Sequence, residues 1–152
     1  MPPDEAEPRR PRPRRRENIR YYVDEDILGL GYAMMWARTD TVTCGETLVE
    51  DDLPRQIPDP AWIPFVATHG WVAITSNRKI RTNPIEGAAA RTSGARIVCV
   101  HDERGDLNTW QKLGLLVLHW DKPERFVEEH AGGPWWLSVT RSGVRELDYG
   151  KH

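Results

Sequence analysis

The chain has 152 residues, of which 39% are apolar and 29% are charged, and its net charge is −2. These values are typical of one globular domain with its own core and exclude a fibrous protein. No apolar run reaches the roughly 18 residues of a transmembrane helix, and the N-terminus lacks the apolar segment of a secretory signal, so we expect no membrane association.

The charge is unevenly distributed along the chain. Residues 1–16 contain six Arg and three acidic residues, which gives +3 and leaves −5 for the rest. The same stretch holds five Pro and has no apolar period, so we predict a disordered tail over residues 1–18 and one domain over residues 19–152. The tail is either a polybasic arm for nucleic acid or an extension without an essential role.

Two cysteines, Cys44 and Cys99, lie in separate apolar runs. We predict buried free thiols rather than a disulfide, and therefore a cytoplasmic protein. Neither cysteine has a Cys or His neighbour at zinc spacing, which argues against a structural zinc site.

The first ordered element is expected at residues 19–23, where Tyr, Tyr and Val favour a strand that ends in the acidic run Asp24-Glu25-Asp26. A helix is predicted over residues 27–37, with one buried stripe at i, i+3, i+7 and i+10. We assign Met34, Met35 and Trp36 of this helix to the core.

The rest of the chain alternates between strand and helix patterns. Strands are predicted at residues 40–44, 71–75 and 95–100, helices at 59–69, 83–92, 106–118 and 121–130, and a terminal hairpin at 135–140 and 144–147. Asp59 is expected to cap its helix, with Pro60 at the first helical position. The helix at 106–118 is expected to gather its apolar side chains on one side, at Leu107, Trp110, Leu113, Gly114 and Val117. This order predicts an α/β fold, a three-layer α/β/α sandwich with a central, mostly parallel sheet and a C-terminal β-hairpin.

Polar residues cluster where parallel strands are expected to end. Asp24 and Asp26 follow the first strand, Asn77 follows the third, and Asp59 opens the helix that leads into the third. The carboxyl ends of parallel strands share one edge, and clustered carboxylates repel one another unless a cation lies between them. Oxygen ligands suit Mg²⁺ or Mn²⁺. In the alternative, Asp24 or Asp26 merely caps the next helix, and Asp59 lies at the opposite edge.

The turn after the third strand is basic. Arg78, Lys79 and Arg81 would meet the phosphates of an RNA strand that approaches a metal at this edge.

Three segments together resemble the PIN-like domain of VapC-type toxins: RYYVDED at residues 20–26, IPDPAWI at 57–63 and GWVAITSNRKIR at 70–81. The likeness covers about residues 19–147. It implies a metal-dependent endoribonuclease of a type II toxin–antitoxin module, with Asp24 and Asp59 as catalytic acids and a metal held by Asp24, Asp26, Asp59 and Asn77. Asn77 stands where the family usually has Asp.

The resemblance also implies partners. RNA would be the substrate, and a cognate antitoxin would cover the acidic cleft with a basic segment; a homodimer is a further expected assembly. Two other functions stay open. One is a PIN-like RNA- or protein-binding module whose catalysis is weakened because Asn77 supplies no charge, and the other is a structural partner protein whose acids are helix caps.

Overall fold

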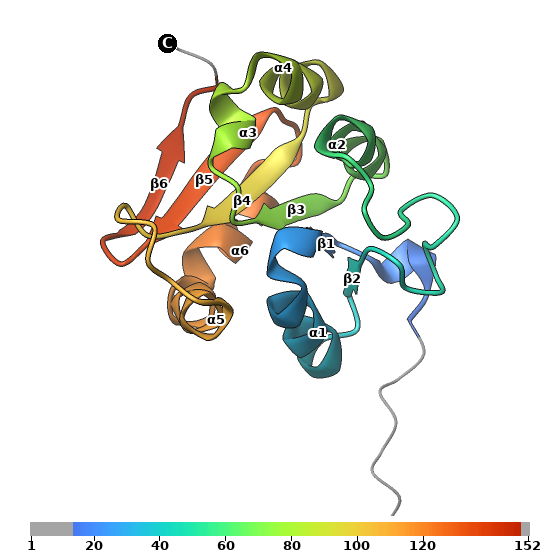
Figure 1. Cartoon of the computed structure of the whole chain (residues 1–152), viewed down its shortest axis with the longest axis horizontal. Helices are drawn as coiled ribbons and strands as arrows, with labels where there is room; N and C mark the ends of the chain where they lie inside the picture. Colours follow the sequence, from blue (N-terminus) through green and yellow to red (C-terminus); the bar gives the residue numbers. More distant parts are fainter. Residues whose placement is uncertain (1–13, 150–152) are drawn as a thin grey trace, which may run out of the picture.

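The computed structural model describes residues 14–149 of the chain. A six-stranded sheet forms its centre, and helices flank both faces (Figure 1). In chain order the elements are η1 (Arg16–Asn18), β1 (Tyr21–Val23), η2 (Glu25–Ile27), α1 (Leu28–Ala37), β2 (Thr41–Thr43), α2 (Asp59–Thr68), β3 (Val72–Thr75), α3 (Lys79–Thr82), α4 (Pro84–Ser93), β4 (Arg96–Val100), α5 (Thr109–His119), α6 (Asp121–Glu129), β5 (Trp135–Thr140) and β6 (Gly143–Leu147).

The sheet has the strand order β2-β1-β3-β4-β5-β6. All neighbouring strands run parallel except β5 and β6, which form an antiparallel hairpin. The three-layer α/β/α architecture with a C-terminal hairpin is therefore confirmed. The hairpin is also part of the main sheet, because β5 pairs in parallel with β4.

The central strands are buried on both faces, as expected for a parallel sheet covered by crossover helices. One face packs against α2, α3 and α4, through side chains such as Trp62, Val66 and Ile80. The opposite face packs against α1, α5 and α6, with Leu30 and Leu116 among the buried contacts. The helices thus divide between the two faces in the way that Figure 1 shows.

Two predicted helix faces are wrong. Trp36 is exposed rather than in the core, because α1 is apolar on all sides and the sheet contacts the side that holds Leu30 and Met34. In α5 the exposed residues include Trp110 and Val117, while Leu116 is buried. Periodicity did not identify the inner side of either helix, since each carries apolar residues on two sides.

Two local predictions at helix starts also need correction. The cap of α2 is Pro58, and Asp59 is the first helical residue with no capping bond from its side chain. The basic stretch after β3, expected as a turn, is the short helix α3. Asn83 does cap α4, because its side chain accepts from two backbone N–H groups.

The ends of the described chain add two facts. Arg16–Asn18 form the short helix η1, and Arg16 pairs with Asp52 at 2.8 Å, so regular structure begins ahead of residue 19. The remainder of the predicted tail, residues 1–13, lies outside the described residues. Within residues 14–149, no helix combines the length and apolar character that a bilayer span requires.

Candidate active site

The carboxyl ends of β1 and β3 meet because the two strands are hydrogen-bonded neighbours, with Val23 opposite Ile74. The N–H of Asp24 donates to the carbonyl of Ile74 at 2.8 Å, which extends the pairing by one residue. The acidic run after β1 therefore lies directly beside Thr75, the last residue of β3.

Asp24 is a buried carboxyl, with 6% of the residue exposed. It occupies the cap position of η2, yet its side chain makes no capping hydrogen bond. Instead its Oδ2 accepts from Thr75 Oγ1 at 2.9 Å. Burial, followed by the charge of Asp26, raises the pKa of Asp24 to about 8. The cap interpretation of Asp24 therefore has no support in its hydrogen bonding.

Asp26 reaches the same threonine from the first turn after β1. Its Oδ2 accepts the N–H of Ser76 at 3.1 Å and lies 3.5 Å from Thr75 Oγ1. Loss of solvation raises the pKa of Asp26, against the opposing effect of the Ser76 N–H and the charge of Lys112. Thr75 thus lies between two carboxyl groups, and both favour their protonated forms.

Asp59 comes to this edge from α2. Its Oδ1 accepts from Trp62 Nε1 at 2.8 Å and its Oδ2 from Asn77 Nδ2 at 3.2 Å. The charge of Asp59 contributes to the raised pKa of both Asp24 and Asp26. Asp59 therefore lies at the edge of the other two acids, as predicted, and not at the opposite one.

Asn77 connects this group to α3. Its Nδ2 donates to Asp59, while its Oδ1 accepts from the N–H of Lys79 at 3.1 Å. Its own N–H donates to Thr75 Oγ1 at 3.0 Å. The side chain of Asn77 orients Asp59 and begins α3, and both its polar atoms have partners.

A fourth acid, Glu86, joins the group from the first turn of α4. Burial is the main cause that raises its pKa, and the nearby charge of Asp59 adds to it. Four acidic side chains from β1–η2, α2 and α4 thus share one edge of the sheet.

Comparison with protein-family models assigns residues 20–102, more than half of the chain, to the PIN-like domain. The chain belongs to this family. Searches of curated proteins and of solved structures gave no significant match. The matched region includes all four acids of the edge, whereas α5, α6 and the hairpin follow it.

The donors of this PIN-like domain fit a hard divalent cation in type and in charge. Asp24 and Asp26 supply carboxylate oxygens on either side of Thr75 and are destabilised as anions, which a cation would relieve. Within residues 14–149, no three His, Cys, Asp or Glu side chains form a group that could hold a metal ion. Mg²⁺ typically uses one or two carboxylates and completes its shell with water and phosphate oxygens, so the Asp24–Asp26 pair suffices for the fit.

The basic side chains of the PIN-like domain are only partly available. Arg78 and Lys79 are exposed at the start of α3. The guanidinium of Arg81 donates to the carbonyl of Asp148 at 2.7 Å, so part of its donor capacity is used within the chain. Lys112 of α5 lies close enough for its charge to lower the pKa of Asp26.

Three residues of the site were not identified from sequence. Thr75 looked like an ordinary strand residue, and Glu86 looked like a solvated residue in the first turn of a helix. Lys112 lies 86 positions after Asp26 and carries no local signal. The cap at Asn83 could have pointed to Glu86, because it fixes the start of a helix close to the end of β3.

Proposed function

We propose that this PIN-like domain is a metal-dependent endoribonuclease that hydrolyses RNA phosphodiesters, and that it is the toxin of a type II toxin–antitoxin module. PIN-like domains are commonly nucleases. The observation that carries the proposal is the gathering of Asp24, Asp26, Asp59 and Glu86 at one edge of the sheet. Such an accumulation of buried negative charge is costly unless a cation binds there.

Each residue has a separate role in this proposal. Asp24 and Asp26 would hold Mg²⁺ or Mn²⁺, and Thr75 fixes their positions through its hydroxyl. Such a cation supplies Lewis-acid activation of water and of the phosphodiester, and stabilises the leaving oxygen. Asp59, oriented by Trp62 and Asn77, faces the same space.

Basic side chains would bind the RNA backbone. Arg78 and Lys79 project from the start of α3 beside the acids, where phosphates of a bound strand would pass. Arg81 would add a contact with the donors that its bond to Asp148 leaves over. The Arg-rich tail extends the same positive charge toward RNA.

A cognate antitoxin is the partner that the toxin role requires. The acidic edge would attract a basic segment of that protein, which would compete with RNA and metal for Asp24 and Asp26. A cytoplasmic location follows from an RNA substrate and is consistent with two free, buried cysteines in the described chain.

The test is cleavage of a generic single-stranded RNA by the purified full chain with Mg²⁺, with Mn²⁺ and with EDTA. We expect cleavage only with metal, and no cleavage by Asp26→Asn. The control is Asp51→Asn, which removes an exposed carboxylate from the loop before α2. Metal-independent cleavage, or full activity of Asp26→Asn, would contradict the proposal. For the toxin role, induction in cells should arrest growth, and co-expression of a protein encoded beside it should restore growth.

A second function is favoured by the bonding of Asn77. Its neutral side chain donates to Asp59 at the position where VapC-type proteins usually carry a further acid. A domain weakened in this way would bind RNA or protein without cutting it. Retention of RNA on the basic surface, with no cleavage by either metal, would favour this binding module.

A further inference from the structure

The surface formed by α1 and α5 lies away from the acidic edge and is apolar. The ten residues of α1, Leu28–Ala37, include no charged side chain. A helix that is apolar on all sides is normally buried on all sides. Yet Trp36 is 69% exposed, and Tyr32 is also exposed.

The outer side of α5 continues this surface. Trp110 is 79% exposed and Leu118 is 74% exposed, and Val117 lies on the same side. Together with Gly114 they follow the i, i+4, i+7, i+8 spacing of a helix stripe that contacts another element. An added Cβ at Gly114 would have no neighbour within 4 Å, so no other part of the described chain covers this stripe.

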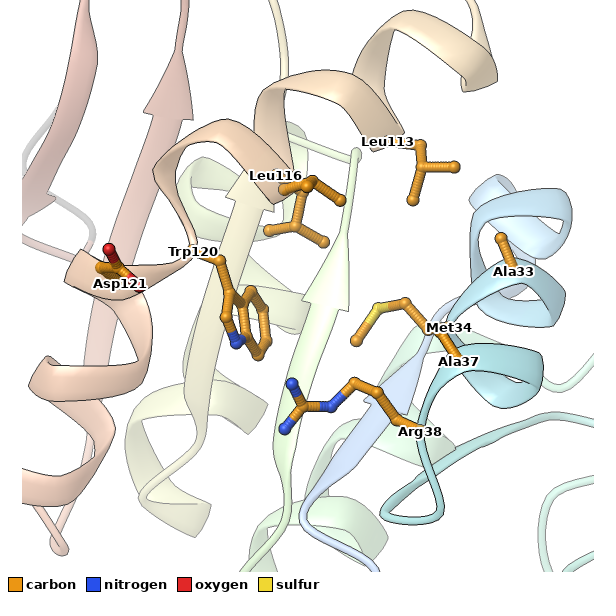
Figure 2. A pocket seen from close by; sticks show the side chains of 9 residues that line it. Ala33, Met34, Ala37, Arg38, Leu113, Leu116, Trp120 and Asp121 are labelled. Atoms are coloured by element: carbon orange, nitrogen blue, oxygen red, sulfur yellow. The ribbon is translucent and has the colours of Figure 1, made fainter. Parts of the chain in front are cut away.

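A groove of about 450 Å³ separates the two helices (Figure 2). At their N-terminal ends the helices are close, since a Cβ built on Gly29 would lie 3.4 Å from Thr109 Cγ2. Farther along, α1 presents only Ala33 and Ala37 on the groove side, and these short side chains leave the space open. Met34 and Leu116 are among the residues that line it.

The charges of the groove are already largely matched within the chain. Arg38 pairs with Asp40 at 2.8 Å and with Glu124 at 3.7 Å, and its guanidinium lies 5.0 Å from the ring centroid of Trp120. Of the nine lining residues, only Arg38 and Asp121 are charged. A strongly basic or strongly acidic partner would therefore find little complementary charge.

We propose that the occupant of this surface is a second copy of the chain, in a twofold-symmetric dimer built on α1 and α5. A twofold contact needs one surface that complements itself. This surface carries both a projecting indole, at Trp36, and an open apolar groove, lined by Ala33 and Ala37. Trp36 of each copy would enter the groove of the other.

The area fits such a dimer. With roughly 150–250 Å² for each aromatic side chain at full exposure, the exposed parts of the five large apolar residues amount to about 600–700 Å² per copy. Two copies would then bury about 1,300 Å², within the approximate 1,200–2,000 Å² of specific interfaces. The same area exceeds the usual largest apolar patch of a monomer, about 300–600 Å². The five residues are Tyr32, Trp36, Trp110, Val117 and Leu118.

The test is the molar mass of the full chain in solution, measured by size-exclusion chromatography with light scattering on nuclease-treated protein. We expect twice the 17.5 kDa of one chain at about 100 μM protein. The mass should persist at about 0.5 M salt, since apolar contacts are not screened, whereas bridging by residual RNA would dissociate.

Single substitutions then locate the contact. Trp36→Glu and Val117→Glu should each raise the dimer dissociation constant by about 30-fold or more, as for a central interface residue. Trp36→Phe should retain the dimer. The matched control is Ile85→Glu on α4, where Ile85 is also 69% exposed and lies on the opposite layer.

All four variants change exposed side chains, and a circular dichroism spectrum confirms that each is folded. A monomeric wild-type chain at this concentration would overturn the proposal and leave the surface to a different partner. A dimer that both glutamate variants leave intact, or that Ile85→Glu dissociates equally, would overturn it as well.

Discussion

Replacing Asp24 by Asn should stabilise the metal-free protein while it abolishes cleavage. Asp24 is buried, and in the folded chain burial and the charge of Asp26 raise its pKa to about 8, against 3.8 for an ordinary Asp. The Asn side chain keeps an oxygen that accepts from Thr75 Oγ1. The variant therefore removes the cost of a buried charge without removing its hydrogen bond.

The sign and size of the effect follow from proton linkage. Between about pH 4 and pH 8 the folded Asp24 keeps a proton that the unfolded chain has lost, so the wild-type free energy of unfolding falls as pH rises. One proton corresponds to about 1.4 kcal/mol per pH unit. Relaxation and water entry reduce the total, and we expect Asn to gain on the order of 2–4 kcal/mol at pH 8. That gain raises the melting temperature by roughly 5–15 °C.

The assay is urea unfolding of both proteins from pH 5 to pH 9 in EDTA, with Asp51→Asn as the control for loss of an exposed carboxylate. The advantage of Asp24→Asn should grow with pH up to about 8 and then level off. Added Mg²⁺ should stabilise the wild type and narrow the gap, because it binds only the folded carboxylates. An advantage that is independent of pH, or that shrinks as pH rises, would refute the burial argument.

Three further outcomes are expected. Asn77→Asp should raise Mg²⁺ affinity and cleavage while it lowers metal-free stability, which melting across a Mg²⁺ series reads directly; identical melts in both conditions would show that residue 77 does not face the acids. Replacing Arg78 and Arg81 by Ala should weaken RNA binding and flatten its salt dependence by about 0.7 per lost contact, with deletion of residues 1–16 as the control. Gly31→Ala should destabilise by about 1–3 kcal/mol in urea unfolding, because its Cβ would lie 3.2 Å from Val23, whereas Gly114→Ala on open α5 should stabilise by about 0.5–1 kcal/mol. Equal effects at the two glycines would contradict the packing reason.

The strands could be predicted from sequence because burial on both faces leaves continuous apolar runs, such as Val72–Thr75 and Arg96–Val100. Helix starts were accessible where chemistry is local, as at Asn83 with Pro84. The inner side of α1 was not, since apolar residues surround that helix and only the sheet decides which of them become buried.

The site was predictable to the extent that topology brings strand ends together. Adjacent β1 and β3 place Asp24 and Asp26 beside residues 75–77, as the parallel order implies. The distance from Asp59 to this edge depended on how α2 lies across the sheet, which spacing along the chain does not encode. Glu86 and Lys112 approach from α4 and α5, so their contribution required the packed structure.

The electrostatics of this edge connect metal and RNA in the proposed function. With its pKa near 8, Asp24 is largely protonated at neutral pH in the metal-free protein, which limits the repulsion that Asp26 and Asp59 exert on it. A bound cation would displace that proton and turn a surface that repels phosphate into one that attracts it. Exposed Arg78 and Lys79 then act beside the cation rather than against the acids. Metal binding should therefore release a proton, and the affinity for Mg²⁺ should rise with pH up to about 8, in step with the loss of metal-free stability.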